Sequence, residues 1–251
     1  MLQISNLQTG FRYKKSTTVL LSSVSFTVSA GEFCVILGRN GTGKTTLLRT
    51  VAGLHKALNG SINFVHPQTN TPAKYRAIVT TERFRLSYFR VEDVIALGRY
   101  PHTDYFGNLQ ENDRNIIKKA IELVDISHLI TKPLSQLSDG EYQKVMIARA
   151  LAQDTPLLLL DEPTAHLDIV NRIGIFHLLK KISSQNGKAV LCTTHEVELA
   201  LQTADKIVLL DGRGRAYTGT PTDLIEQGHI KAAYTSERVH FNEKLRCFEA
   251  K

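Results

Sequence analysis

The stretch that decides the fold is Gly38-Arg39-Asn40-Gly41-Thr42-Gly43-Lys44-Thr45, which fits the G-x-x-x-x-G-K-[ST] pattern of a phosphate-binding loop (P-loop). The apolar run 33–37 precedes it without polar alternation, as in a parallel strand buried on both faces. Residues 46–52 follow it and are prone to form a helix that ends at Gly53. This order presents backbone N–H groups and a helix N-terminus to phosphates, so the stretch predicts binding of a nucleoside triphosphate.

The side chains of the loop have separate expected tasks. Its glycines let the backbone turn inward on the phosphates. Lys44 is expected to reach the β- and γ-phosphates, and the Thr45 hydroxyl to bind Mg2+, a cation that prefers oxygen ligands. The expected nucleotide-binding residues are Gly38, Arg39, Asn40, Gly41, Thr42, Gly43, Lys44, Thr45 and Thr46.

Two adjacent carboxylates follow another buried strand. The run Leu157–Leu160 ends in Asp161 and Glu162, at the carboxyl edge of the sheet, where P-loop chemistry requires acidic groups. Neighbouring strand residues point in opposite directions. We therefore expect Asp161 to bind the metal and Glu162 to act as general base toward the attacking water.

The order of apolar runs predicts an α/β fold with a P-loop NTPase core. Buried-type runs alternate with helix-like segments, which indicates a mostly parallel sheet covered by helices on both sides. Residues 4–7 and 24–28 instead alternate apolar and polar, which predicts a small N-terminal antiparallel β-sheet. About 75 residues after the second run have helical apolar spacing and no strand pattern, which predicts an inserted α-helical subdomain. The buried-type runs are 33–37, 77–79, 157–160, 189–192 and 207–210.

These segments describe one domain spanning residues 1–251. Residues 1–80 and 152–251 are expected to form the nucleotide-binding core, and residues 81–151 the helical subdomain. Near the end of the chain, Gly219–Asp223 is typical of a helix entry that Thr222 or Asp223 could cap. The segment 213–251 is therefore predicted to be structural.

Composition narrows the class of protein. The net charge is +7, and residues 1–60 hold seven Lys or Arg against Glu32 alone. That excess suits a polyphosphate or an anionic lipid surface, whereas nucleic acid ranks last because no basic cluster is interleaved with aromatics. The sequence has neither a membrane-spanning run nor a signal peptide, so a cytosolic chain is expected. Cys34, Cys192 and Cys247 are odd in number and widely spaced, which favours buried thiols.

A further motif carries a family resemblance. Ser138 and Glu141 form a capping box before an apolar-periodic helix. With Gln143 and the run Ala148–Ala152, this segment resembles the signature motif of ABC transporter ATPases, and nearly the whole chain follows that family's order of motifs. The resemblance implies ATP and Mg2+ as cofactors, Asp168 as the D-loop residue and His195 as a γ-phosphate contact. It also implies a homodimer in which the signature of one copy faces ATP on the other; its residues are Ser138, Asp139, Gly140 and Glu141.

The chain departs from the family pattern at two places. Asp139 and Glu141 replace the commoner Gly and Gln, and we expect Asp139 to point away from the phosphate. The segment Thr80–Arg83 lacks the Gln that senses Mg2+ and couples to membrane subunits; Thr81 or Glu82 would substitute, and Glu82 could bind Mg2+. In the family an N-terminal aromatic stacks on adenine. Phe11 is favoured for this role here, with Tyr13 as the alternative.

Two functions remain open. The first is the ATPase of an ABC importer, because Val91–His102 resembles the matching stretch in iron-siderophore, haem and vitamin B12 uptake. This implies permease partners, an extracytoplasmic binding protein and a peripheral position on the cytoplasmic side of the inner membrane. Six aromatics within 84–106 either pack the subdomain or face a partner: Phe84, Tyr88, Phe89, Tyr100, Tyr105 and Phe106.

The second function is that of a soluble ABC ATPase acting on a protein, a ribosome or DNA, whose core motifs would look the same. A GTPase switch is excluded, because no Asn-Lys pair is present to begin the guanine-binding motif.

Overall fold

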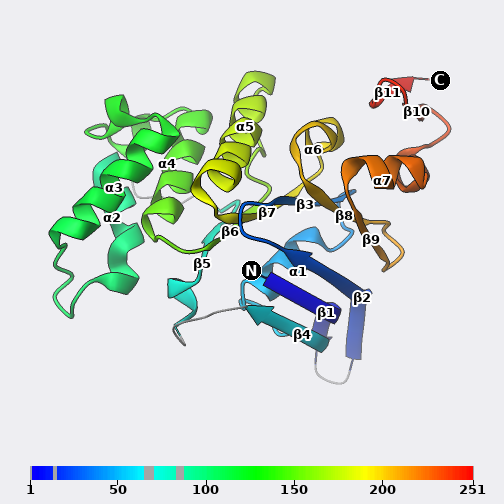
Figure 1. The fold of residues 1–251 in the computed structure, drawn as a ribbon, viewed down its shortest axis with the longest axis horizontal. Coiled ribbons are helices and arrows are strands. Elements are labelled where there is room, and N and C mark those ends of the chain that lie inside the picture. Colours follow the sequence, from blue (N-terminus) through cyan, green and yellow to red (C-terminus); the bar gives the residue numbers. More distant parts are fainter. Residues whose placement is uncertain (1, 14–15, 65–70, 83–87, 251) are drawn as a thin grey trace.

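The strand that leads into the P-loop lies in the interior of the central sheet of the protein. The computed structural model describes residues 2–13, 16–64, 71–82 and 88–250. The strand order is β5-β6-β7-β3-β8-β9, with parallel pairing from β5 through β8 and an antiparallel edge strand β9 (Figure 1). The strands are β3 (Phe33–Gly38), β5 (Arg76–Val79), β6 (Leu157–Asp161), β7 (Ala189–Thr194), β8 (Lys206–Leu210) and β9 (Ala216–Gly219). The predicted mostly parallel sheet is confirmed.

The predicted N-terminal antiparallel sheet is also confirmed. Its strand order is β2-β1-β4, and both pairings are antiparallel. The strands are β1 (Leu2–Tyr13), β2 (Ser16–Val28) and β4 (Asn59–Phe64).

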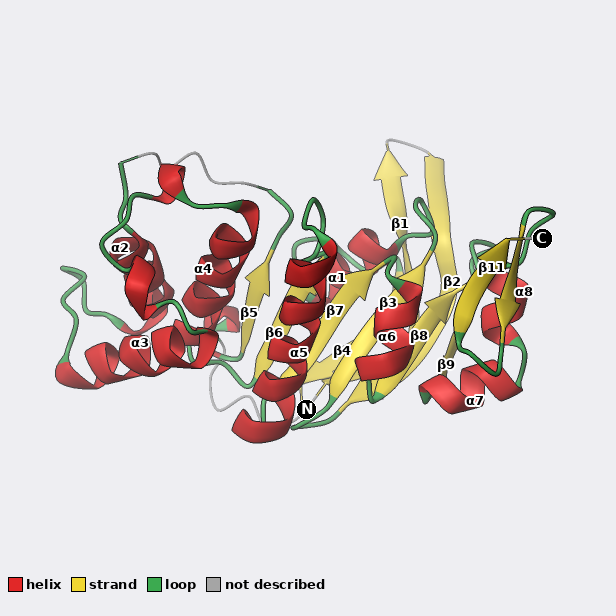
Figure 2. Cartoon of the chain, turned by 90° about the horizontal axis from the view of Figure 1, so that it is seen from above, coloured by secondary structure: helices red, strands yellow, loops and turns green. Residues whose placement is uncertain are grey.

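Two apolar clusters lie on opposite faces of the central sheet. Along β3, Val35 belongs to the cluster that includes Phe176 of α5, whereas Ile36 belongs to the cluster that includes Leu47 of α1 and the N-terminal sheet. This alternation follows from the period of two in a strand. Figure 2 shows α5 and α6 lying over one side of the sheet. The helices are α1 (Lys44–Val51), α5 (Ile169–Asn186) and α6 (Val197–Thr203).

The predicted helical insertion lies at one end of the molecule (Figure 1). Its α4 packs against both α2 and α3. At Gly98 the chain passes so close to α4 that a Cβ atom would lie 2.2 Å from the Arg149 carbonyl oxygen. The helices are α2 (Val91–Ala96), α3 (Glu111–Val124) and α4 (Asp139–Ala152), joined by short 3₁₀ segments η2 (Leu97–His102), η3 (Ser127–Leu129) and η4 (Leu134–Gln136). A separate 3₁₀ turn, η1 (Pro72–Lys74), precedes β5.

The C-terminal segment forms α7 (Pro221–Glu226), α8 (His229–Tyr234) and a hairpin of β10 (Val239–Asn242) and β11 (Cys247–Ala250). The helix entry was predicted correctly. Of the two predicted capping residues, Asp223 takes part in a capping box by accepting the Thr220 amide at 2.9 Å, but neither is the N-cap. Thr220 is the N-cap and accepts a hydrogen bond from the Asp223 amide, because Pro221 takes the first helical position. Cys34 and Cys192 are buried as predicted, while Cys247 is half-buried.

Within the described ranges, no helix combines the length and apolar character that crossing a membrane requires.

A buried ion pair fixes the helical subdomain. Arg99 Nε donates to Asp113 Oδ1 at 2.8 Å, and Arg99 Nη1 donates to the Ala152 carbonyl at 2.9 Å. Both side chains are buried. The pair therefore links the segment after α2 to α3 and to the end of α4.

The substitution Asp113→Ala should lower the free energy of unfolding by about 3–5 kcal/mol, because the Arg99 guanidinium then stays buried without its carboxylate partner. Urea denaturation measures this change. The control Glu122→Ala removes the exposed partner of Lys118 and should cost less than about 0.5 kcal/mol. Equal losses in the two variants would contradict the role of the buried pair.

The same pair predicts a pH dependence. A hydrogen bond from the Gln110 amide, followed by the interaction with Arg99, lowers the pKa of Asp113 against the opposing effect of burial. A carboxyl group with a depressed folded-state pKa stabilises the protein above its unfolded pKa of about 4. The Asp113 contribution should therefore be complete at neutral pH and be lost as the pH falls below about 4, which urea denaturation across that range measures.

Candidate nucleotide-binding site

The P-loop lies at the carboxyl end of β3 and leads into α1. Gly41 and Gly43 have φ angles of 82° and 96°, in the left-handed region that favours glycine. At Gly38, a Cβ atom would lie 2.6 Å from the Thr42 hydroxyl. Thr42 Oγ1 also donates to the Arg39 carbonyl at 2.9 Å, which closes the turn. The glycines thus permit the loop conformation expected from the sequence.

A pocket of about 460 Å3 opens in front of this loop. Phe11 lies in its wall, half-exposed and packed edge-on against His55. Tyr13 is not among the described residues that line the pocket. The wall consists of Phe11, Leu20, Asn40, Gly41, Gly43, Lys44, Thr45, Thr46 and Glu162. The structure therefore brings the P-loop, one N-terminal aromatic and the predicted general base to one cavity.

Lys44 is held inside the loop. Its side chain is only 4% exposed, and its Nζ donates to the Gly38 carbonyl at 2.9 Å and the Arg39 carbonyl at 3.3 Å. The same Nζ lies 3.2 Å from Glu162 Oε1. The ammonium thus lies inside the P-loop, with Glu162 as its counter-ion.

Asp161 is the most buried acidic group of the site, at 1% exposure. Its Oδ1 accepts hydrogen bonds from Thr45 Oγ1 at 2.9 Å and Thr193 Oγ1 at 2.8 Å. Its Oδ2 is buried and has no hydrogen-bond partner within the described residues; Arg49 Nε lies 3.9 Å away. An orphaned carboxylate oxygen beside a threonine hydroxyl suits Mg2+, which proteins bind through one or two side chains plus substrate phosphates.

Thr193 is a site residue that the sequence did not single out. It faces Asp161 in the β6–β7 register. Its hydroxyl donates to Asp161 and also accepts the Glu162 backbone amide at 2.9 Å. The polar pair Thr193-Thr194 at the end of an apolar strand was the available signal.

Glu162 and His195 face each other at the ends of adjacent strands. His195 Nδ1 lies 2.9 Å from Glu162 Oε2. Glu162 has a φ angle of 44°, unusual for a residue with a side chain. The Thr193 hydroxyl that binds its amide helps to hold this conformation. Glu162 therefore lies between Lys44 and His195.

Glu82 lies beside the site but does not contact Asp161 directly. Its Oε1 is 3.1 Å from Arg49 Nη2, and its side chain is exposed. Arg49 thus stands between Glu82 and Asp161. Thr81 is likewise exposed, and Arg83 lies outside the described residues.

The signature segment belongs to the helical subdomain, apart from the P-loop (Figure 1). The predicted capping box is present: the Ser138 amide donates to Glu141 Oε2 at 2.8 Å, and the Glu141 amide donates to Ser138 Oγ at 3.3 Å. The hydrogen bonds that the Ser138 amide and hydroxyl donate to Glu141 Oε2 lower the pKa of that carboxyl group. Among the described residues lining the P-loop pocket, none comes from 138–141. Asp139 is exposed.

The D-loop residue is connected to the signature through one asparagine. Asp168 caps α5 by accepting the Asn171 amide at 2.8 Å. A Cβ atom at Gly140 would lie 2.6 Å from Asn171 Oδ1, so only glycine allows α4 to approach α5 at this point. Asn171 was not predicted from the sequence.

Comparison with known sequences identifies relatives over almost the entire chain. A protein from Methanocaldococcus jannaschii, the uncharacterized ABC transporter ATP-binding protein MJ0873, is 36% identical across 100% of this chain and 87% of its own length. The achromobactin transport ATP-binding protein CbrD of Dickeya dadantii is 30% identical, with 93% and 88% covered. The cobalamin import ATP-binding protein BtuD of Halobacterium salinarum is 32% identical over 90% of this chain and 58% of its own length.

Solved structures have the same fold. A proposed metal-chelate type ABC transporter in an inward-facing conformation matches with a TM-score of 0.80 and 27% identity, covering 92% of this chain and 88% of that one. The dimeric structure of MJ0796, a bacterial ABC transporter cassette, matches with a TM-score of 0.73 and 25% identity, covering 88% and 99%. A family profile for the ABC transporter domain matches residues 21–165. The chain therefore belongs to the ABC transporter family, as one of its ATP-binding ATPase cassettes.

Proposed function

We propose that this ATPase powers an ABC importer for an iron chelate, haem or cobalamin. The observation that carries the catalytic part is the pairing of Lys44 with Glu162 in the wall of the P-loop pocket. Asp161 accepts a hydrogen bond from Thr45 of the same wall, and His195 lies at hydrogen-bond distance from Glu162. The importer part is supported by the relatives named for achromobactin transport and cobalamin import. Because these two names differ in cargo, they support a class of large chelates and not one substrate.

The geometry suggests how the residues divide the work. When ATP enters the pocket, its phosphate oxygens would replace the Gly38 carbonyl and the Glu162 carboxylate as partners of Lys44 Nζ. Glu162 would then be free to accept the proton of the attacking water. His195 Nδ1 holds the Glu162 carboxylate from the other side and orients it.

Thr45 and Asp161 would hold Mg2+, which neutralises charge on the β- and γ-phosphates. Phe11, in the pocket wall, would stack on adenine. Glu82 would influence the metal through Arg49, because Arg49 lies between Glu82 and Asp161.

A second copy would complete the site. Ser138–Glu141 lies outside the P-loop pocket of its own chain, so its contribution to ATP would come from the partner. The dimeric form of the similar cassette MJ0796 supports this arrangement. Asn171 contacts both Asp168 and Gly140. A movement of Asp168 would therefore shift the signature segment that faces the ATP of the partner.

The permease would dock on the exposed aromatics of the helical subdomain. Tyr88 and Tyr105 are 97% and 98% exposed, and Tyr100 and Phe106 are also largely exposed. These rings therefore do not form the core of the subdomain, which favours the partner alternative left open by the sequence. Phe84 lies outside the described residues. This docking would place the chain on the cytoplasmic face of the membrane, with an extracytoplasmic binding protein delivering the cargo.

Uptake by cells tests the cargo class. A strain lacking this chain should lose uptake of radiolabelled ferric chelate, haem or cobalamin, and the wild-type chain should restore it. Loss of none of the three would contradict the importer proposal. It would favour the alternative of a soluble ABC ATPase acting on a protein, a ribosome or DNA.

Lys44→Ala should lower ATP hydrolysis by at least about 100-fold, because the developing charge on the γ-phosphate loses its main cation. Phosphate release by the purified protein measures the loss. Lys56→Ala, an exposed lysine beyond α1, is the matched control and should hydrolyse ATP normally. Near wild-type turnover in Lys44→Ala would refute the assignment of the P-loop.

Glu162→Gln should bind ATP and accumulate as a stable dimer, since association precedes the blocked hydrolysis step. Size-exclusion chromatography with light scattering should detect an ATP-dependent doubling of mass. A variant that hydrolyses ATP at the normal rate would show that Glu162 is not the base.

Thr193→Val should lower kcat about tenfold, corresponding to about 1.4 kcal/mol, because it removes hydrogen bonds to Asp161 and to the Glu162 amide. It should also raise the Mg2+ concentration needed for half-maximal activity. Thr155→Val removes a comparable buried hydrogen bond to the Leu157 carbonyl at the other end of β6. Equal kinetics in the two variants would contradict a specific role for Thr193.

A further inference from the structure

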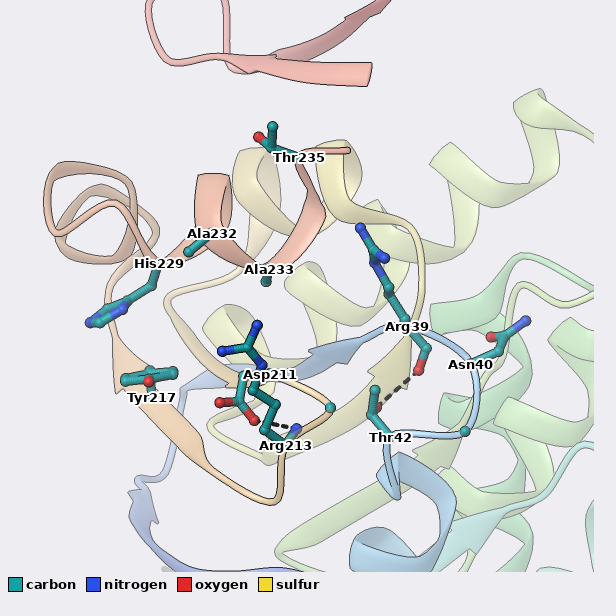
Figure 3. A pocket seen from close by; sticks show the side chains of 12 residues that line it. Arg39, Asn40, Thr42, Asp211, Arg213, Tyr217, His229, Ala232, Ala233 and Thr235 are labelled. Atoms are coloured by element: carbon teal, nitrogen blue, oxygen red, sulfur yellow. Dashed lines mark hydrogen bonds between the residues drawn. The ribbon is translucent and has the colours of Figure 1, made fainter. Parts of the chain in front are cut away.

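We propose that a second pocket, between the P-loop and the C-terminal segment, binds a small anion carrying phosphate groups. Its volume is about 600 Å3, compared with about 460 Å3 for the nucleotide pocket. Both volumes are typical of small-molecule sites. Figure 3 shows the second pocket between Arg39 on one side and Tyr217 and His229 on the other.

This pocket adjoins the nucleotide pocket at the P-loop. The two cavities share Asn40 and Gly41 as wall residues. Beyond these, the nucleotide pocket continues to Lys44 and Glu162, whereas the second continues to the β8–β9 turn and α8. An occupant of the second pocket would therefore contact the P-loop without occupying the place of ATP.

Two arginines give the pocket its charge. Arg39 comes from the P-loop and Arg213 from the β8–β9 turn. Across the part of the chain that the structure describes, neither guanidinium has a carboxylate within ion-pair distance. Asp211 is the acidic residue of the wall, and its Oδ1 accepts the backbone amides of Arg213 at 2.7 Å and Arg215 at 3.1 Å. The Asp211 carboxylate is thus hydrogen-bonded within its own turn. Because the wall has two arginines and one acidic residue, the pocket has a net positive charge.

Ring contacts hold the remaining wall of the pocket. Tyr217 and His229 stack with ring centroids 3.9 Å apart. Arg39 lies over the ring of Tyr234, with its guanidinium carbon 5.8 Å from the centroid. The Thr235 hydroxyl is buried, lines the same pocket and has no hydrogen-bond partner among the described residues.

The geometry favours phosphate groups over other anions. The guanidinium group matches phosphate oxygens in a bidentate fashion, and two such groups from different elements suit a ligand with several oxygens. The pocket size limits the occupant to a small molecule.

Binding here would be coupled to the nucleotide site. The Arg39 carbonyl accepts both the Thr42 hydroxyl and Lys44 Nζ. An anion that moves Arg39 would therefore change the loop that holds Lys44. By thermodynamic linkage, nucleotide binding and anion binding then alter each other's affinity by the same factor.

Calorimetric titration of pyrophosphate into protein saturated with Mg-ADP tests the site. Arg213→Ala should weaken pyrophosphate binding at least tenfold and leave ADP affinity unchanged, because Arg213 does not line the nucleotide pocket. Arg215→Ala is the matched control: it removes an exposed arginine from the same turn that does not line the second pocket. It should retain wild-type binding of pyrophosphate.

Three results would overturn the proposal. Absence of pyrophosphate binding to the wild-type protein would show that the pocket holds no such anion. Equal binding by the wild type and Arg213→Ala would place pyrophosphate on the P-loop instead. Equal weakening in Arg213→Ala and Arg215→Ala would indicate a general charge effect. In each of these cases, unchanged ADP affinity in both variants would show that the assignment of the nucleotide site still holds.

The same titration distinguishes the sources of the phosphate group. Inorganic phosphate and glycerol 3-phosphate, each tested against wild type and Arg213→Ala, compare a free ion with a phosphorylated organic molecule. Whichever of the two probes binds more tightly, in a way that depends on Arg213, identifies the class of occupant and supports the site.

Discussion

The parallel register of β6 and β7 is the constraint on which the rest of the site depends. It sets Asp161 opposite Thr193, and the Thr193 hydroxyl then binds both the Asp161 carboxylate and the Glu162 amide. A slip of one residue would turn every side chain of β6 to the other face of the sheet. The positions of Asp161 and Glu162 therefore come from strand pairing and not from loop flexibility.

The same sheet explains how side chains that are far apart in the sequence come together. β3, β6 and β7 end at one edge, so the P-loop, Asp161, Glu162 and His195 meet there. Lys44 and Glu162 neutralise each other across the pocket. This pairing keeps two opposite charges close together in a partly buried place.

Much of this could be predicted from the sequence, because the signals were local. The P-loop pattern, the unbroken apolar strands and the Ser138–Glu141 capping box each depend on residues that are close in the chain, and the structure has all of them. Contacts between distant segments could not be predicted. Thr193 acts through strand register, Arg49 bridges Glu82 and Asp161, and Asn171 fills the space beside Gly140. The Thr220 cap is a local feature that the sequence contains, because Pro221 beside it marks the first helical position.

In the proposed function, ATP hydrolysis by this chain drives a membrane permease. The most direct measurement is to tag the protein in its own cells, solubilise the membranes gently and quantify what co-purifies. We expect a polytopic membrane protein in near-equal amounts, whose identity would also define the cargo. Recovery with soluble proteins or ribosomes alone would contradict the transport role and leave an ABC ATPase with a different partner.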